Sequence, residues 1–316
     1  MNATWEDRAC PLCGSSDQSR VVAESNIDLA QLDRYAFASR KSPEYMHPRL
    51  IECPDCGLWY GSPVLSRDTL SAAYRRAGFD SGTEARYASA SYAGQIHQIL
   101  PRLPDRDAAL DIGTGDGAFL EQLLGLGFHD VAGVEPSEAP YAAAKPGIRD
   151  KIRVGLFRPE DFSPQCFSLI TCFQTMEHVP APFELVRGAR SLLKPGGALV
   201  IVVHNRKALS ARILGFKSPI FDIEHLQLFS PETARDLLVR AEYRDVRVTP
   251  MWNRYPLAYW LKLLPFPAGV KASLLDLAGR SAIGRTPIAL PAGNLVCVGY
   301  RSRASPRSAR RAVSAM

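Results

Sequence analysis

Through the middle of the chain, short apolar runs alternate with longer segments in which apolar residues return every three or four positions. Runs of the first kind predict buried strands, and segments of the second kind predict amphipathic helices. The predicted strands cover 109–112, 131–135, 152–155, 167–173 and 198–203, and the predicted helices cover 116–126, 137–144 and 182–193. This alternation favours an α/β fold with a doubly wound parallel sheet, in which ligands bind beyond the carboxyl ends of the strands.

The flanking segments extend this domain on both sides. Ser230 followed by Pro231 predicts a capped helix start. Two later apolar segments should complete the sheet as an antiparallel edge pair. The additional predicted elements are helices over 66–74, 87–103 and 230–241 and strands over 246–249 and 295–300.

The segment 255–267 is almost wholly apolar, with Lys262 as its only charged residue. It is shorter than the roughly 20 residues that span a bilayer, and its prolines interrupt a helix. We expect it to be a lid over an apolar substrate, a dimer face or a helix that rests on a membrane surface. It forms part of a C-terminal apolar insertion over about 251–291.

The chemistry is anchored in the glycine-rich stretch after the first predicted strand. Gly113, Gly115 and Gly117 remove side chains where the backbone must turn and where a ligand can lie close to it. Asp111 ends the strand and Asp116 lies in the loop, and carboxylates at these places would repel a pyrophosphate. They would attract a ligand that carries an ammonium and a sulfonium, and S-adenosylmethionine (SAM) is such a ligand.

A further acid, Glu135, ends the next predicted strand, where a carboxylate can accept two hydrogen bonds from a ribose diol. With these residues the sequence resembles the class I SAM-dependent methyltransferases. Four motifs stand in that family's order, and together they make a nicotinamide-dinucleotide domain or a degenerate fold the weaker alternative. The motifs lie at 110–117, 133–137, 176–178 and 193–197, within a resemblance that covers roughly 87–243.

The resemblance implies a Rossmann-like methyltransferase sheet and SAM as the cofactor. It implies that an acid after the third strand accepts the adenine amino group, and Asp161 is preferred over Glu160 for this role. Phe173 ends the fourth strand, so the topology of the sheet places it at the carboxyl ends of the strands, where the cofactor should bind. A solvated acidic loop is the alternative for Asp161.

Four cysteines near the N-terminus form two copies of one pattern, Cys-Pro-x-Cys-Gly: Cys10 with Cys13, and Cys53 with Cys56. The spacing lets both sulfurs of a pair point at one centre, and the following glycine accepts the positive φ of such a turn. Two pairs predict a closed, structural four-thiolate zinc site, with disulfides as the alternative. The other cysteines lie in or beside apolar strands and are predicted to be inert core thiols: Cys166, Cys172 and Cys297.

Methyl transfer to a hydroxyl or an acidic carbon needs a base, and histidine titrates near neutral pH. The candidates are His178 after the fourth strand, His204 at the end of the fifth, and His225 beyond it. His225 is the first choice because Asp222 and Glu224 can orient its ring or raise its basicity, and His178 is the second choice. The alternative is that His225 caps a helix entry or packs under the lid.

The chain of 316 residues, 46% hydrophobic and 22% charged, suffices for one large α/β domain and a small module. We divide it into a zinc-ribbon module over 1–65, a methyltransferase domain over 66–301 and a disordered basic tail over 302–316. The first residues carry acids and no apolar core, so we expect a cytoplasmic protein. Contact with a membrane surface or a homodimer through 255–267 stays open.

These observations predict SAM-dependent methyl transfer to a small metabolite, for which a sugar or lipid-linked glycan with a hydroxyl or acidic carbon fits. The net charge of +6, much of it in the tail, leaves an RNA methyltransferase as an alternative. Nucleic acid is the less favoured partner because no Asn-Pro-Pro-aromatic motif, frequent in enzymes that methylate nucleobase amines, follows the fourth strand. A further alternative is a non-catalytic zinc-ribbon binding protein with a relic cofactor fold.

Overall fold

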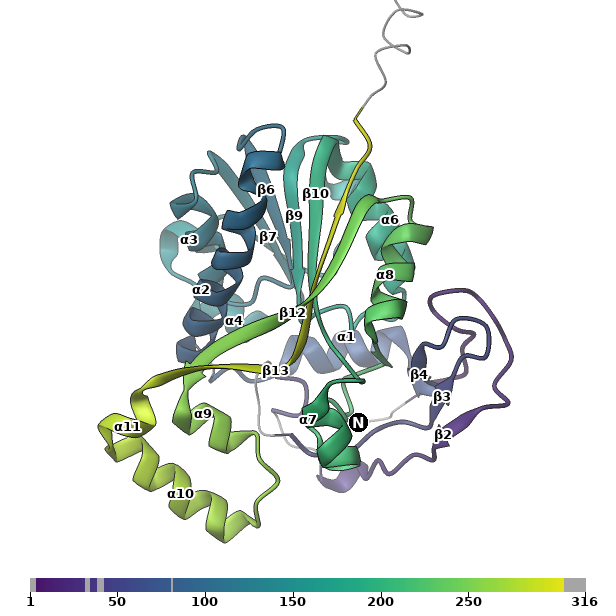
Figure 1. The fold of residues 1–316 in the computed structure, drawn as a ribbon, viewed down its shortest axis with the longest axis vertical. Coiled ribbons are helices and arrows are strands. Elements are labelled where there is room, and N and C mark those ends of the chain that lie inside the picture. Colours follow the sequence, from purple (N-terminus) through teal and green to yellow (C-terminus); the bar gives the residue numbers. More distant parts are fainter. Residues whose placement is uncertain (1–3, 32–34, 39–42, 81, 304–316) are drawn as a thin grey trace, which may run out of the picture.

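The computed structural model describes residues 4–31, 35–38, 43–80 and 82–303. Its centre is a sheet of β6 (Ala108–Ile112), β7 (Asp130–Glu135), β8 (Ile152–Val154), β9 (Phe167–Phe173), β10 (Leu193–His204), β12 (Arg244–Pro256) and β13 (Pro287–Tyr300). The strands lie in the order β12-β13-β10-β9-β6-β7-β8 (Figure 1). β6 to β10 are parallel, and β13 runs antiparallel between β10 and β12. The predicted doubly wound sheet with an antiparallel edge pair is confirmed.

Helices cover both faces of this sheet, as their apolar periodicity requires (Figure 1). Leu120 and Leu123 are buried on one side, and Leu185, Leu192 and Leu237 are buried on the other. The first side carries α2 (Gly82–Ile99), α3 (Ala118–Gly125) and α4 (Glu138–Ala143), and the second carries α6 (Pro182–Leu192) and α8 (Pro231–Arg240). The helix predicted over 87–103 begins earlier than expected and ends as a short 3₁₀ turn, η2 (Leu100–Arg102).

The N-terminal module lies beside α8, below the parallel strands in Figure 1. Its elements include β1 (Trp5–Glu6), β2 (Val21–Ala23), β3 (Leu50–Glu52), β4 (Trp59–Gly61) and β5 (Val64–Leu65), followed by α1 (Arg67–Arg76). A strand from far along the chain, β11 (Gln227–Leu228), pairs with β4 and completes a sheet ordered β11-β4-β3-β2. The module therefore shares a hydrogen-bonded sheet with the main domain.

The antiparallel hairpin of β12 and β13 is much longer than the edge pair predicted from sequence. The hairpin extends past the other strands (Figure 1). Three helices connect the end of β12 to the start of β13: α9 (Leu257–Lys262), α10 (Ala268–Arg280) and α11 (Ala282–Arg285). Tyr255 and Trp260 are buried, and the Trp260 Nε1–H donates to the Ile288 carbonyl at 3.1 Å. Among the described residues, no helix is both long enough and apolar enough to cross a membrane.

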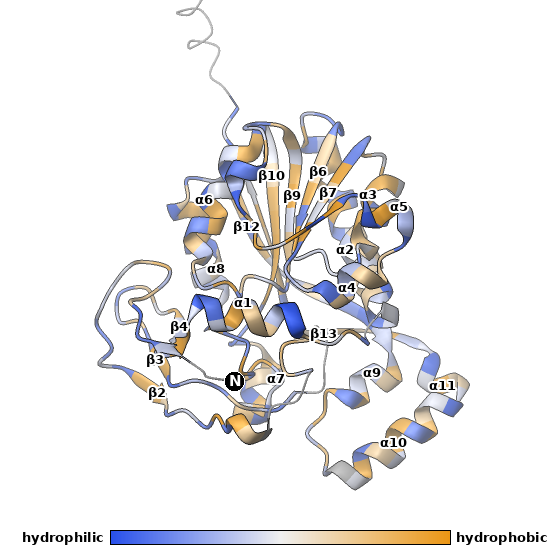
Figure 2. Ribbon diagram, turned by 180° about the vertical axis from the view of Figure 1, so that it is seen from behind, coloured by the Kyte–Doolittle hydropathy of each residue, from blue (hydrophilic) through white to orange (hydrophobic). Residues whose placement is uncertain are grey.

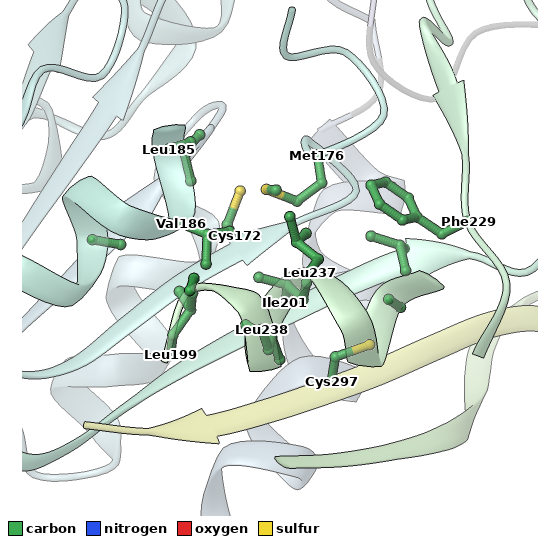
Figure 3. Close-up of a cluster of buried hydrophobic side chains, with 14 of the residues drawn as sticks. Cys172, Met176, Leu185, Val186, Leu199, Ile201, Phe229, Leu237, Leu238 and Cys297 are labelled. Atoms are coloured by element: carbon green, nitrogen blue, oxygen red, sulfur yellow. The ribbon is translucent and has the colours of Figure 1, made fainter. Parts of the chain in front are cut away.

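The core on the α6 and α8 side of the sheet continues from the parallel strands into the N-terminal module. Figure 3 shows its centre, where Met176 and Phe229 lie close together above Ile201. Tyr60 and Leu58 of the module belong to the same cluster of buried side chains. Burial raises the pKa of the Cys172 and Cys297 thiols, which is consistent with inert core thiols.

Candidate active site

A cavity of about 1130 Å³ lies at the carboxyl ends of the parallel strands. One part of its wall is the loop after β6 together with the end of β7, where the cofactor residues were predicted. Another part comes from α1, the loop after β9, the segment after β10 and α9. The predicted cofactor loop and the predicted histidine cluster therefore face one continuous space.

The three glycines of the loop adopt backbone conformations that other residues avoid. Gly113, Gly115 and Gly117 have φ values of 78°, 60° and 74°. A Cβ on Gly113 would come within 2.2 Å of the Thr175 hydroxyl, and one on Gly117 within 2.3 Å of the Ile148 side chain. No atom lies within 4 Å of the equivalent position on Gly115. The loop is thus tightly packed at its two ends and open in its middle.

Glu135 fastens this loop from the neighbouring strand. Its carboxylate accepts the backbone N–H of Gly115 at 2.8 Å and that of Ser137 at 2.8 Å. Burial raises the pKa of Glu135, while these two hydrogen bonds act in the opposite direction. Each carboxylate oxygen retains a further lone pair, so the group can hold the loop and also accept bonds from a diol.

Two other carboxylates give this end of the cavity a negative character. Asp111 is buried and accepts a hydrogen bond of 2.6 Å from the Thr171 hydroxyl. Asp116 accepts the Ala118 N–H at 3.2 Å, where α3 begins. Both residues line the cavity. Their charges favour a cationic ligand over a phosphate, as the sequence suggested.

The two remaining predicted cofactor residues, Phe173 and Asp161, have different locations. Phe173 lines the cavity and packs against Tyr92 and Phe119, with ring centroids 4.3 and 4.9 Å away. Asp161 lies in η3 (Pro159–Asp161) outside the cavity lining and forms an ion pair of 3.0 Å with Arg153. Phe173 is therefore placed to contact a cofactor, whereas Asp161 is held at the side of the site.

The structure brings all three predicted histidines together. The ring of His225 lies 4.9 Å from that of His178 and 5.2 Å from that of His204, measured between centroids. His178 Nδ1 lies 3.5 Å from a Glu224 carboxylate oxygen and 3.1 Å from the Tyr74 hydroxyl. This histidine cluster, formed by His178, His204, His225 and Glu224, lines the cavity.

The environment of His225 favours its neutral form. Its ring is buried, and Nδ1 donates to the Ile220 carbonyl at 2.8 Å, which leaves Nε2 as an acceptor. Burial lowers the pKa of His225 well below its ordinary value, and the neighbouring His178 and His204 act in the same direction. The Asp222 carboxylate acts to raise the pKa of His225, but it does not offset these effects. The ring is therefore neutral at neutral pH, with Nε2 unprotonated. Burial outweighs the Asp222 carboxylate, so the ring is a weaker base than an ordinary histidine and the expected rise in basicity is not found.

Three members of the cluster could also approach a cation. His178, Glu224 and His225 each offer a ligand atom within 4.8 Å of the others. However, the His178 nitrogen that faces Glu224 is the one beside the Tyr74 hydroxyl. Ligation through that atom would displace a contact that the structure contains, so we favour proton exchange as the role of the cluster.

The four N-terminal cysteines converge as predicted. The Sγ atoms of Cys10 and Cys56 lie 3.6 Å apart and those of Cys13 and Cys53 lie 3.5 Å apart, and all four are free thiols. Sulfurs arranged tetrahedrally around zinc at about 2.3 Å are about 3.8 Å apart, so this donor set fits the ion. The glycines after the two pairs, Gly14 and Gly57, have φ values of 78° and 74°, which confirms the predicted turns.

Sequence reasoning missed several polar residues of the cavity wall. Tyr74 comes from α1, which was predicted as a helix with no role in the site. Asn253 and Asn294 are buried on β12 and β13, and the Asn294 side-chain oxygen accepts a hydrogen bond of 2.9 Å from His204. For Asn294, an amide directly before the apolar run that starts at Leu295 was the available signal, whereas Asn253, between Trp252 and Arg254, offered none.

The strand order, the acidic glycine loop at the end of the first parallel strand and the carboxylate at the end of the second define a class I SAM-dependent methyltransferase. A family model described as a methyltransferase domain matches residues 85–248. The chain belongs to this family.

Among curated proteins, the chain is similar to the ubiquinone biosynthesis O-methyltransferase of Marinobacter nauticus, with 34% identity over 111 residues. The match covers 32% of this chain and 46% of that protein. The enzyme of the same name from Pseudomonas aeruginosa (strain UCBPP-PA14) is 32% identical over 114 residues, covering 34% of this chain and 49% of that protein. The chain thus spans just under half the length of these relatives, and their names refer to neither sugars nor glycans.

The chain is also similar to two solved structures. A SAM-dependent methyltransferase from Archaeoglobus fulgidus has 18% identity and a TM-score of 0.45, over 75% of this chain and 100% of that one. Phosphoethanolamine N-methyltransferase 2 of Haemonchus contortus, solved with SAM, has 15% identity and a TM-score of 0.44, over 70% of this chain and 57% of that one.

Proposed function

We propose that the protein transfers a methyl group from SAM to a hydroxyl of a small metabolite that has both a polar and an apolar part. The observation that carries this proposal is the continuity of the cavity, which joins the acidic glycine loop to a cluster of histidines. The names of the curated relatives, which are O-methyltransferases, support oxygen as the methylated atom.

The loop from Gly113 to Gly117, with Asp111 and Glu135, would hold SAM. The two carboxylates supply negative charge, and that of Glu135 can also accept hydrogen bonds from a diol. The space beside the Gly115 backbone is empty, so a ligand can lie against it. SAM, when bound, supplies a methyl group already activated by its sulfonium. The protein then has to align the acceptor, exclude water and remove one proton.

The histidine cluster is suited to that last task. When the acceptor oxygen is methylated, its hydroxyl proton would pass to Nε2 of His225. Its Nδ1–H, fixed on the Ile220 carbonyl, holds the ring in the tautomer that this requires. His178, beside Glu224, is the second candidate for the same proton.

The rest of the cavity wall favours an acceptor with an apolar part. Tyr255, Tyr259, Trp260 and Leu263 line it beyond the histidine cluster, so α9 is suited to the role of a lid. An apolar chain or ring of the acceptor would lie against these side chains, with its hydroxyl at the cluster. This chemistry suits a phenol with an apolar substituent better than an unsubstituted sugar.

We also propose that the four cysteines bind one structural zinc ion. Four thiolates close the coordination sphere, so the ion would stabilise the module and take no part in methyl transfer. This role agrees with the place of Cys10 and Cys53 in the shared hydrophobic core.

The test of the proposed function compares the variants His225→Ala and His178→Ala with a control variant, His97→Ala. Purified enzyme and labelled SAM are incubated with phenols that carry or lack an isoprenoid chain and, in parallel, with sugars. With the best acceptor, His225→Ala should lower kcat about 10²- to 10⁴-fold and leave the SAM affinity unchanged. The exposed His97→Ala on α2 serves as the control.

Normal turnover in His225→Ala would exclude that ring as the base. Loss of turnover in His178→Ala alone would assign the role of the base to His178. Methylation of sugars but not of phenols would refute the proposed acceptor class.

A further inference from the structure

The residues of the histidine cluster come mainly from two loops. The first loop, 174–181, follows β9 and contains His178, and the second loop, 222–226, precedes β11 and contains Glu224 and His225. They are joined directly by the Leu226 N–H, which donates to the Glu177 carbonyl at 2.8 Å. Because neither loop lies within the parallel sheet, their spacing depends on contacts of this kind.

Arg8, from the N-terminal module, bridges both loops with one side chain. Its guanidinium donates to the carbonyl of Pro180 in the first loop at 3.2 Å, and to the carbonyl of Leu226 in the second. Its Nε donates to the Gly61 carbonyl of β4 at 2.9 Å. Arg8 thus ties the loop that carries His178 to the loop that carries His225.

Gln227 completes this bridge from β11. Its side chain is fully buried, and its Nε2 donates to the carbonyls of Met176 at 2.5 Å and Val179 at 2.9 Å. Its Oε1 accepts a hydrogen bond of 3.1 Å from Arg8. Since β11 pairs with β4, with Gln227 opposite Tyr60, the second loop is anchored to the sheet of the module.

The chemistry of these contacts requires a guanidinium. Three nitrogens of Arg8 donate to four acceptors that come from three separate segments of the chain. The planar guanidinium presents five N–H groups in fixed directions, whereas a lysine ammonium is a single point that cannot reach all four.

We propose that Arg8 and Gln227 are positioning residues, which hold His178 and His225 at the separation that catalysis needs and thereby couple the N-terminal module to the active site. The inference rests on the proposed function of the histidine cluster. It gives the module a role in turnover in addition to its own folding.

The test uses full-length protein and hydrogen–deuterium exchange, which needs no substrate. In Arg8→Ala, amide exchange in 174–181 and 222–228 should accelerate about tenfold or more, because both loops open locally more often. Exchange in 108–117 and the SAM affinity should not change. Arg8→Lys should behave like Arg8→Ala. The matched control is Arg49→Ala, because Arg49 contacts Gln18 and Glu24 within the module.

A second readout separates positioning from folding. With the acceptor found above, Arg8→Ala should lower kcat about 10- to 100-fold while KM for SAM stays unchanged, as expected for misplaced catalytic groups. Unchanged exchange in both loops, or equal acceleration over all of 4–65, would overturn the inference. So would full activity in Arg8→Lys.

Gln227→Glu provides an independent test in case Arg8→Ala does not fold. It keeps the shape of the side chain and an acceptor for Arg8, but it removes both donors to the first loop. Exchange in 174–181 should then accelerate, and unchanged exchange there would count against the proposal. If wild-type protein methylates none of the acceptors, the proposed function fails, whereas the exchange result still tests the bridge.

Discussion

Replacing Glu135 by alanine removes the carboxylate that connects the glycine loop to the end of β7. In the structure this group accepts two backbone N–H bonds of 2.8 Å, from Gly115 and Ser137. We expect it also to accept the ribose hydroxyls of SAM. The substitution therefore changes both the ligand contacts and the loop that forms the binding surface.

The size of the effect follows from these contacts. Hydrogen bonds to a charged group contribute about 1.5–3 kcal/mol, so the Kd for SAM should rise about 10- to 150-fold. Each of the two backbone N–H groups that loses its acceptor lowers the free energy of unfolding by about 1–3 kcal/mol where it stays buried. The buried carboxylate itself costs stability above its raised pKa, and that cost shrinks as the pH falls through this pKa and is gone only below the ordinary pKa of the unfolded chain. The net loss of stability should therefore be smaller than the two N–H groups suggest.

Isothermal titration calorimetry with SAM measures the change in affinity, and thermal unfolding of the same samples measures the change in stability. Glu138→Ala is the matched control, because Glu138 stands three positions later and is exposed. An unchanged Kd for SAM in Glu135→Ala would refute the assignment of the glycine loop as the cofactor site.

The other predictions concern the metal, the apolar insertion and the dependence of stability on pH. Elemental analysis should find about one zinc per chain, falling to near zero in Cys10→Ser, and native disulfides in a mass spectrum would refute the site. The exposed Leu277 and Ile283 should mediate liposome binding or dimerisation that their replacement by Asp abolishes, and a monomer indifferent to lipid would leave only the role of a lid. For Glu232, hydrogen bonding to Ser230 and contact with Lys207 lower the pKa to about 2, so its stabilisation should be present above about pH 4.5 and lost as the pH falls towards 2. The difference in melting temperature between wild type and Glu232→Gln should shrink over that range, and a difference independent of pH would contradict this.

The sequence by itself determined the elements and the local motifs. The strand that contains Asp111, the glycine loop and the two cysteine turns depend on interactions between residues a few positions apart, so their patterns predict them well. The strand order could be anticipated too, because alternating strands and helices permit few arrangements. The sequence named His178, His204 and His225 as separate candidates for the base, and only the structure shows that their rings lie together.

Only the tertiary structure decided which distant residues meet. Arg8 contacts Pro180 across 172 positions, and no local pattern predicts such a contact. The same holds for the pairing of β11 with β4. Contacts of this kind arise from how the N-terminal module and the sheet pack against each other. Periodicity reports whether a side chain is buried, but the partner it is buried against is set by the whole fold.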